Sequence, residues 1–207
     1  MDYIHYLKDS ESRLDRKRRF YESKYIELLA DHGPVFDVGC GTGNFLARAR
    51  GSVRCYGLDL LRGNAVRCQE RGIVAAVGSI VSLPVRDGGL GGLFASHVLE
   101  HLGRDELLTA ATEIERVLRP GGKAVIVVPY PRDLWEFYAD PTHVSPMTPK
   151  RLRMLFNRFA RVELVNYCIP GLKWLLTVRY NQFPLYELLL RFVPLRGRTA
   201  LIAVCTK

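Results

Sequence analysis

Short apolar segments alternate with helical patterns along residues 33–129, and this alternation limits the fold more strongly than any other feature of the sequence. Glycines and prolines separate the segments, and each apolar stretch has the length of a buried strand. The predicted strands lie at 33–39, 52–60, 72–78, 89–97 and 123–129, and the predicted helices lie at 44–50, 62–72 and 104–119, the last stopped by Pro120-Gly121-Gly122. This order predicts a doubly wound α/β sheet, with a ligand at the carboxyl ends of its strands.

The flanking residues extend this sheet without adding a second domain. We expect a helix at 11–31, a helix near 148–157, and two further strands near 160–167 and 198–205. A chain of 207 residues holds the resulting seven strands in one domain. An aromatic, proline-rich connection at 130–149 is of the kind that covers a site.

Composition narrows the class of protein. Apolar residues make up 48% of the chain and charged residues 25%, as in ordinary globular proteins, and no apolar run reaches the ~18 residues of a membrane span. The first twenty residues are too charged for a signal peptide. The five cysteines are scattered without a Cys-x-x-Cys pair, which argues against a disulfide framework and against a metal site. We therefore expect a cytoplasmic protein that binds no metal.

The net charge of +9 is unevenly distributed. Residues 150–207 contain 11 Lys and Arg against only Glu163 and Glu187, whereas 19 basic and 19 acidic residues balance in 1–149. All excess positive charge therefore lies in the last quarter of the chain. Such an asymmetry bears on the partners of a protein and not on its fold.

Three glycines follow the first predicted strand in the segment VFDVGCGTGNF, at Gly39, Gly41 and Gly43. Glycine is favoured where a backbone turns sharply or a ligand approaches closely. The spacing G-x-G-x-G differs from the G-x-G-x-x-G of dinucleotide-binding proteins, and Asp37 would repel a diphosphate. Asp59, twenty residues after Gly39, ends the second strand where a carboxylate can accept ribose hydroxyls. A ribose, a cationic tail and no phosphate together describe S-adenosylmethionine.

Five segments, FDVGCGTGNF, GLDL, SLPVRDG, SHVLEHL and ERVLRPGGKAVIVVP, resemble the class I S-adenosylmethionine-dependent methyltransferases in order and spacing. The similarity is greatest to the small subgroup that includes quinone-biosynthesis methyltransferases, and it covers roughly residues 33–130. It implies an enzyme with a Rossmann-like fold and a mixed seven-stranded sheet. The expected divisions are a helical segment at 1–32, a cofactor-binding core at 33–130, and a region at 131–207 with the covering loop, a basic aromatic insertion and the final strands.

The resemblance also implies roles for individual residues in binding S-adenosylmethionine. It assigns Asp59 to the ribose, Leu60 to the face of the adenine, and Ser96 to the neighbourhood of the methyl group. Ser79 and Ile80 would lie at the adenine edge, although many relatives have an acid at the position of Ser79, and a serine bonds without charge assistance. The loop around the methionine part comprises Asp37, Gly39, Cys40, Gly41 and Gly43.

Two histidines are candidates for a general base, which methyl transfer needs only when the acceptor is a hydroxyl or a similar acid. His143 is the first candidate, because it belongs to the covering connection and follows an Asp140-Pro141 turn that can fix its ring. His97 lies at the end of the fourth strand near the expected methyl position, where it either reacts or lines the cofactor pocket. His101 and Glu100 are expected to support the start of the following helix.

The acceptor is expected to be a small molecule, a saccharide or a lipid-like compound methylated at oxygen. An RNA methyltransferase is one alternative, favoured by the basic last quarter but not by any RNA-binding module or N-P-P-[YF] tetrapeptide in the sequence. A protein that binds S-adenosylmethionine without catalysis is another. A nicotinamide oxidoreductase is disfavoured by the glycine spacing.

Residues 170–198 interleave aromatic and leucine side chains with five basic ones and a single acid, Glu187. This pattern fits an ordinary core helix, and it equally fits a surface that docks on an anionic membrane. A peripheral contact with anionic lipid is therefore an expectation for this segment.

Overall fold

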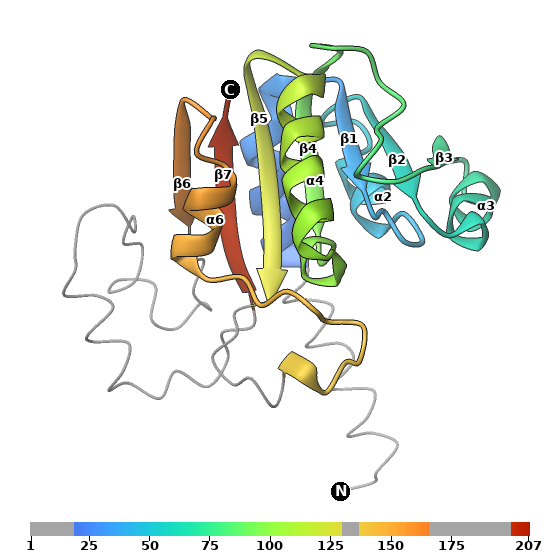
Figure 1. The fold of residues 1–207 in the computed structure, drawn as a ribbon. Coiled ribbons are helices and arrows are strands. Elements are labelled where there is room, and N and C mark those ends of the chain that lie inside the picture. The colour runs from blue at the N-terminus through green and yellow to red at the C-terminus, as the bar shows by residue number, and fades with distance from the viewer. Residues whose placement is uncertain (1–18, 130–136, 166–199) are drawn as a thin grey trace, which may run out of the picture.

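The computed structural model describes residues 19–129, 137–165 and 200–207, which are coloured in Figure 1. In these residues seven strands form one sheet in the order β3-β2-β1-β4-β5-β7-β6. The strands are β1 (Val35–Val38), β2 (Cys55–Asp59), β3 (Ala75–Val77), β4 (Leu90–Ser96), β5 (Leu118–Pro129), β6 (Arg161–Val165) and β7 (Ala200–Thr206). The doubly wound, seven-stranded α/β sheet predicted from the sequence is confirmed.

The sheet is mixed, as expected. Strands β1 to β5 pair in parallel, whereas β7 lies between β5 and β6 and is antiparallel to both. The strand order reverses between β1 and β4, because the chain builds outward first through β2 and β3 and then returns to the other side of β1. In doubly wound sheets this reversal is the point at which ligands bind.

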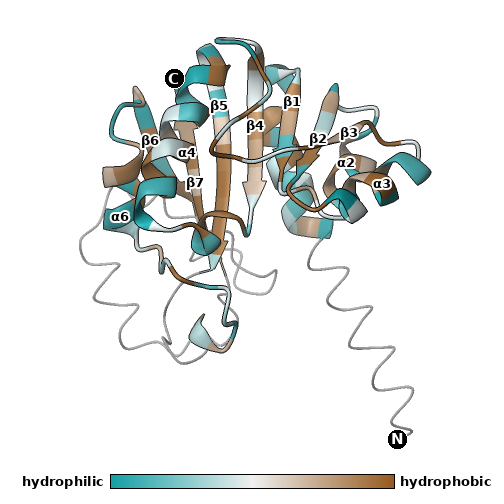
Figure 2. Cartoon of the chain, turned by 45° about the vertical axis from the view of Figure 1, so that its right-hand side comes forward, coloured by the Kyte–Doolittle hydropathy of each residue, from teal (hydrophilic) through white to brown (hydrophobic). Residues whose placement is uncertain are grey.

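Helices cover both faces of the sheet (Figure 1). The α-helices include α2 (Asn44–Ala49), α3 (Arg62–Glu70), α4 (Arg104–Val117) and α6 (Pro149–Leu155), and two 3-10 turns are η1 (Ala30–His32) and η2 (Leu99–His101). The chain is also helical over 19–29. Figure 2 shows apolar residues concentrated in the central strands and polar residues on much of α3 and α6. No helix in the described residues is long and apolar enough to cross a membrane.

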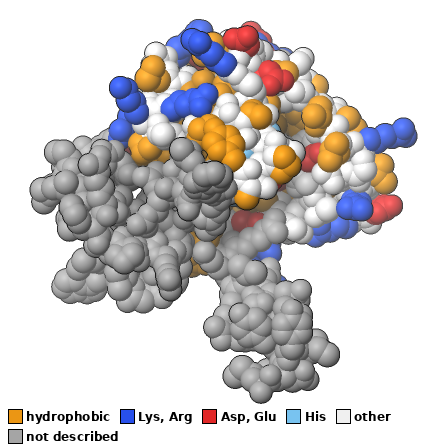
Figure 3. All heavy atoms as spheres, turned by 60° about the horizontal axis from the view of Figure 1, so that its bottom comes forward, with side chains coloured by type: hydrophobic (Ala, Val, Ile, Leu, Met, Phe, Trp, Pro, Cys, Tyr) orange, Lys and Arg blue, Asp and Glu red, His pale blue; other side chains and the backbone are white. Residues whose placement is uncertain are grey.

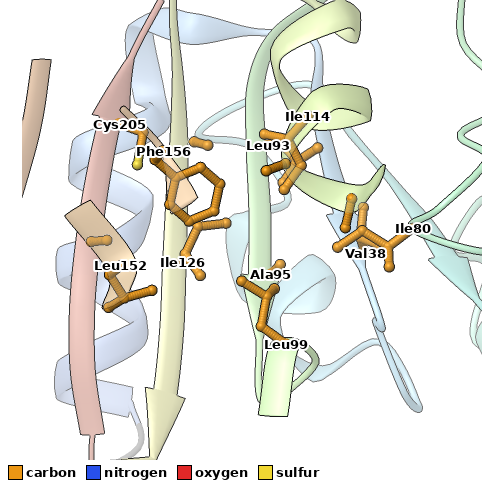
Figure 4. Close-up of a cluster of buried hydrophobic side chains, with 14 of the residues drawn as sticks. Val38, Ile80, Leu93, Ala95, Leu99, Ile114, Ile126, Leu152, Phe156 and Cys205 are labelled. Carbon is orange, nitrogen blue, oxygen red and sulfur yellow. The ribbon is translucent and has the colours of Figure 1, made fainter. Parts of the chain in front are cut away.

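Two apolar clusters hold the layers together. On one face, α4 and α6 pack on the sheet through side chains such as Ile114 and Phe156, which meet Leu93 and Ile126 of the central strands (Figure 4). On the other face, the helix at 19–29 packs with α2 and α3 around Phe94, whose ring stacks on Phe45 at 4.1 Å between centroids. Burial of this kind stabilises the fold by about 25 cal/mol per Å² of apolar surface.

The glycines within β4 serve close packing. The sequence gives a strand interrupted by Gly91 and Gly92, yet β4 is buried along nearly its whole length. A side chain at Gly91 would collide with the backbone of His32 and Gly33, and one at Gly92 would come within 2.9 Å of a Val35 methyl group. These glycines therefore let the backbone after η1 lie directly against the sheet.

The α4 helix ends earlier than the sequence pattern suggests. Its last residue is Val117, and β5 already begins at Leu118, which is fully buried and pairs with Leu90. The helix thus ends two residues before its expected end at Arg119, because Leu118 already pairs with a neighbouring strand. Of the other expected elements, the first part of the 11–31 helix, residues 130–136 of the covering connection and the basic segment 170–198 lie outside the described residues.

Candidate cofactor and catalytic site

The carboxyl ends of β1, β2 and β4 meet at one edge of the sheet, the lower edge in Figure 1. Val38, the last residue of β1, pairs with Leu58 on one side and with Ala95 on the other. The residues that follow these three paired positions are Gly39, Asp59 and Ser96, so the register itself brings three predicted site residues to one level. Figure 3 brings this edge forward and shows hydrophobic side chains gathered on it, with Lys and Arg side chains toward its periphery.

The glycine loop after β1 adopts a backbone that only glycine takes without strain. Gly39, Gly41 and Gly43 have φ of 73°, 53° and 77°, in the left-handed region. A Cβ at Gly39 would lie 2.5 Å from a Val98 methyl group, and one at Gly43 would lie 2.9 Å from the sulfur of Cys68. The loop after β1 thus passes close to Val98, which follows His97, so the segments after β1 and β4 are in contact.

Asp59 fixes this loop. Its carboxylate is 7% exposed and accepts three hydrogen bonds, from Gly41 N at 2.8 Å, Leu61 N at 2.9 Å and Asn64 Nδ2 at 3.1 Å. A carboxylate offers about four acceptor positions, so about one remains for a ligand hydroxyl in this arrangement. The acid therefore shapes the loop as well as offering a place for a ribose, a double role that the sequence pattern does not reveal.

Apolar side chains are exposed beside Asp59. Leu60 and Leu61 follow β2, Val77 ends β3, and their exposed fractions are 70%, 64% and 53%. Large apolar side chains left this exposed at the ligand-binding edge of a sheet form a platform suited to a flat aromatic group. The residues present thus fit an adenosine group, with Leu60 where the resemblance places the face of the adenine.

Three other predicted contacts have side chains turned away from this edge. The Cys40 thiol lies 4.0 Å from the sulfur of Cys68 beneath the loop, and burial raises its pKa well above the usual range. Ile80 is 4% exposed and belongs to the apolar core, while the Ser79 hydroxyl accepts a hydrogen bond from Val81 N at 3.3 Å. Contacts of Cys40 and Ile80 with a cofactor at this edge would therefore come from their backbone.

His97 combines strain with a fixed ring. It has a φ of 56°, and it is the one described residue other than glycine in the positive-φ region. Strain of this kind costs about 1–3 kcal/mol and is concentrated at functional sites. The ring Nδ1 lies 3.1 Å from Oε1 of Glu100, a residue with no exposed surface, whereas the His97 side chain is 52% exposed. A carboxylate at Nδ1 selects the tautomer whose Nε2 can accept a proton.

His101 and His143 form a second group next to Glu100. Their ring centroids are 4.9 Å apart, although the two residues are far apart in sequence. His101 Nδ1 lies 3.2 Å from the carbonyl of Thr142, and His143 Nδ1 lies 2.9 Å from the carbonyl of Phe137. The backbone carbonyl of Glu100 accepts hydrogen bonds from the N–H groups of residues 144 and 145. The described part of the covering connection is therefore attached to η2.

This arrangement corrects the role expected for two residues. Glu100 and His101 do not cap α4, because Glu100 contacts His97 and His101 contacts the covering connection. The cap is supplied by Glu106, whose carboxylate accepts a hydrogen bond from Gly103 N at 2.8 Å. Glu106 is the third residue of the helix, and a glutamate at that position is a known capping signal in a sequence.

Thr142, which contacts His101, also contacts Asp140. Hydrogen bonds from the hydroxyl and the backbone N–H of Thr142 lower the pKa of the Asp140 carboxyl below its ordinary value. Its Oδ2 lies 3.8 Å from Nε2 of His143. The Asp140-Pro141 turn therefore does lie against the His143 ring, as the sequence suggests.

Comparisons with known proteins agree with this geometry. A family model described as a methyltransferase domain matches residues 36–126. The chain is 34% identical over 106 residues to the tRNA (carboxymethyluridine(34)-5-O)-methyltransferase of Macaca fascicularis, covering 51% of this chain and 16% of that one. It is 28% identical over 133 residues to the Arabidopsis thaliana protein of the same name, covering 61% and 32%. The chain thus spans a third or less of the length of these relatives.

A crystal structure of an S-adenosylmethionine-dependent methyltransferase from Archaeoglobus fulgidus has the same fold. It superposes with a TM-score of 0.73 at 23% identity, and the match covers 100% of both chains. The match to the family model, the strand order and the glycine loop held by Asp59 converge on one assignment. Residues 36–126 form a methyltransferase domain, and the chain has the fold of an S-adenosylmethionine-dependent methyltransferase.

Proposed function

We propose that the chain transfers the methyl group of S-adenosylmethionine to an oxygen atom of an RNA acceptor. The observation that carries this proposal is the similarity to two proteins whose names describe methylation of a tRNA uridine at a 5-O position. This reverses the order of acceptors expected from the sequence, where small molecules came first and RNA was the alternative.

The charge distribution supports an anionic acceptor. Residues 150–165, which contain α6 and β6, include five basic residues and one acid. Lys150, at the start of α6, is exposed, and it directly follows the covering connection that holds His143. Arg158 and Arg161 lie 2.8 and 2.5 Å from Glu115 and Glu163, so these two contribute less to the net field. Lysine and arginine that meet phosphates supply much of the affinity for nucleic acids.

The chain's own residues would act in three ways. The glycine loop and Asp59 bind and orient the cofactor, which supplies a methyl group on a sulfonium. Glu100 holds the His97 ring so that Nε2 is free, and Nε2 takes the proton of a hydroxyl acceptor while the oxygen–carbon bond forms and the sulfur–carbon bond breaks. A carboxylate acceptor would need no base. We place the base role on His97, and the role expected of His143 remains the competing hypothesis.

A small lipid-like or saccharide acceptor is the second candidate. It is favoured by two apolar side chains near His143, Tyr138 and Val144, which are 52% and 55% exposed. The membrane contact expected of 170–198 belongs with this candidate, and that segment lies outside the described residues. Binding to anionic vesicles that fades at high salt would support it.

The test is transfer of a labelled methyl group into fractions of a cell extract. Purified protein is incubated with labelled cofactor and separate RNA, lipid and glycan fractions, with Asp59→Ala as the inactive control. We expect label in RNA that nuclease digestion releases as a modified nucleoside. Label only in lipid or glycan would overturn the RNA assignment. Cofactor binding without transfer into any fraction would indicate a protein that binds the cofactor without catalysis.

A further inference from the structure

Glu100, His101 and His143 bring three potential metal ligands together. One ligand atom from each lies within 4.8 Å of the others. The cluster runs from a fully buried carboxylate to an exposed imidazole, so an ion could enter from solvent. Two imidazoles and a carboxylate are the ligand set of catalytic zinc sites that keep one position open.

The hydrogen bonds of the two rings suit coordination. His101 Nδ1 is directed to the carbonyl of Thr142, and His143 Nδ1 to the carbonyl of Phe137. Metal-binding histidines almost always donate their second ring N–H to a carbonyl or a carboxylate, which fixes the tautomer. In both rings this leaves the Nε2 lone pair for a ligand.

Glu100 provides an independent observation. Its side chain has no exposed surface, and its Oε2 has no hydrogen-bond partner within 19–129, 137–165 and 200–207, whereas Oε1 contacts His97. A buried carboxylate oxygen without a partner costs free energy that is normally recovered by a hydrogen bond or a cation. Among the described residues, Glu100 Oε2 therefore has no partner, and a cation could supply one.

We propose that Glu100, His101 and His143 bind one divalent first-row transition ion of the zinc type, through Glu100 Oε2 and the Nε2 atoms of both histidines. Bonds of about 2.0–2.2 Å in tetrahedral geometry require the ligand atoms to lie about 3.3 Å apart, so separations of up to 4.8 Å would have to shorten by about 1.5 Å at most. The ion would then be bound by the same Glu100 carboxylate that contacts His97 through its other oxygen, and its open position could hold an acceptor oxygen and act as a Lewis acid. Binding of the ion rests on the cluster alone and not on the proposed acceptor.

The experiment measures metal binding without cofactor or acceptor. Protein free of any histidine tag is stripped with a chelator, dialysed against Zn²⁺ or Co²⁺, and analysed for bound metal. We expect one ion per chain, a visible Co²⁺ absorption band typical of four or five ligands, and a melting temperature higher by roughly 5 °C at saturating Zn²⁺. No tight binding by the wild-type protein would overturn the proposal.

Variants locate the site. His101→Ala, His143→Ala and Glu100→Gln should each weaken Zn²⁺ binding by at least about tenfold. The matched control is His32→Ala, which removes a histidine of η1 and should leave the stoichiometry and the Co²⁺ spectrum unchanged. Should Glu100→Gln fail to fold, the two histidine variants still decide the question. Equal loss in His32→Ala, or none in the cluster variants, would place the ion elsewhere.

Discussion

The buried carboxylate of Asp59 accepts a hydrogen bond from the backbone N–H of Gly41 at 2.8 Å, so an acid at the end of β2 holds the loop that follows β1. Cofactor affinity and loop geometry consequently depend on the same side chain. The first prediction follows from this coupling.

Asp59→Ala should weaken binding of S-adenosylmethionine by about 1.5–3 kcal/mol, because it removes a charged acceptor from the ribose and frees the loop. Titration calorimetry measures the change. Asp59→Asn keeps an acceptor for Gly41 N and should lose less. The control is Asp31→Ala, an exposed acid of η1. Equal affinities of the wild type and Asp59→Ala would remove the assigned role of Asp59.

Gly39→Ala should destabilise the protein and abolish cofactor binding. The new methyl group would lie 2.5 Å from a Val98 side-chain carbon at a φ of +73°, and the left-handed conformation alone costs about 1–2 kcal/mol. Thermal unfolding and calorimetry measure both effects. Gly63 of α3 has open space around its Cβ and no positive φ, so Gly63→Ala should be neutral or stabilise the fold by up to about 1 kcal/mol. A Gly39→Ala variant that bound normally would contradict the assigned loop.

His97→Asn should lower turnover on a hydroxyl acceptor by roughly 10²-fold while leaving cofactor affinity nearly unchanged. Asparagine tolerates the positive φ of this position, so the substitution removes the base without disturbing the backbone. Steady-state kinetics at saturating acceptor measure the effect. If His143 is the base, His143→Ala shows this loss with unchanged acceptor affinity and His97→Asn turns over normally.

Glu113→Gln should reduce the change in the free energy of unfolding between neutral and acidic pH. Arg116, together with the backbone N–H of Leu83, holds the pKa of the Glu113 carboxyl below its ordinary value. A lowered folded pKa means that the stabilisation is complete above the unfolded pKa near 4.5 and is lost as the pH falls through the folded value. We expect a loss of about 1–2 kcal/mol at pH 7 that disappears in acid. Denaturant melts at several pH values measure it, and a loss that persists undiminished in acid would contradict the prediction.

Sequence patterns predicted the sheet because its information is local. Apolar strands, glycine stops and the acid at position 59 are each visible within a few residues, and the alternation of strands with helices then indicates a doubly wound sheet. The end of α4 at Val117 was not predicted, because it depends on the pairing of Leu118 with Leu90 in another strand. Local pattern and tertiary pairing compete there, and pairing prevails.

The contacts around the candidate catalytic histidines could not be predicted, for the same reason. His97 and His143 were both identified as candidates, but nothing in the sequence shows that His143 stacks near His101 or that Glu100 turns its carboxylate to His97. These contacts depend on how residues 137–145 fold back onto η2. The grouping of Glu100, His101 and His143 has no signature in the sequence, because His143 is 42 residues from His101 and only the fold brings them together.

Strands β6 and β7 are adjacent, and Val165 pairs with Ile202, so the ends of the intervening segment 166–199 are held together by the sheet itself. Closing a flexible loop costs free energy that grows only with the logarithm of its length, about 0.6 kcal/mol per doubling. Large changes in the length of this segment therefore cost the sheet little. The strands on either side of the segment, and the candidate cofactor site at the other strands, can keep their arrangement when its length changes.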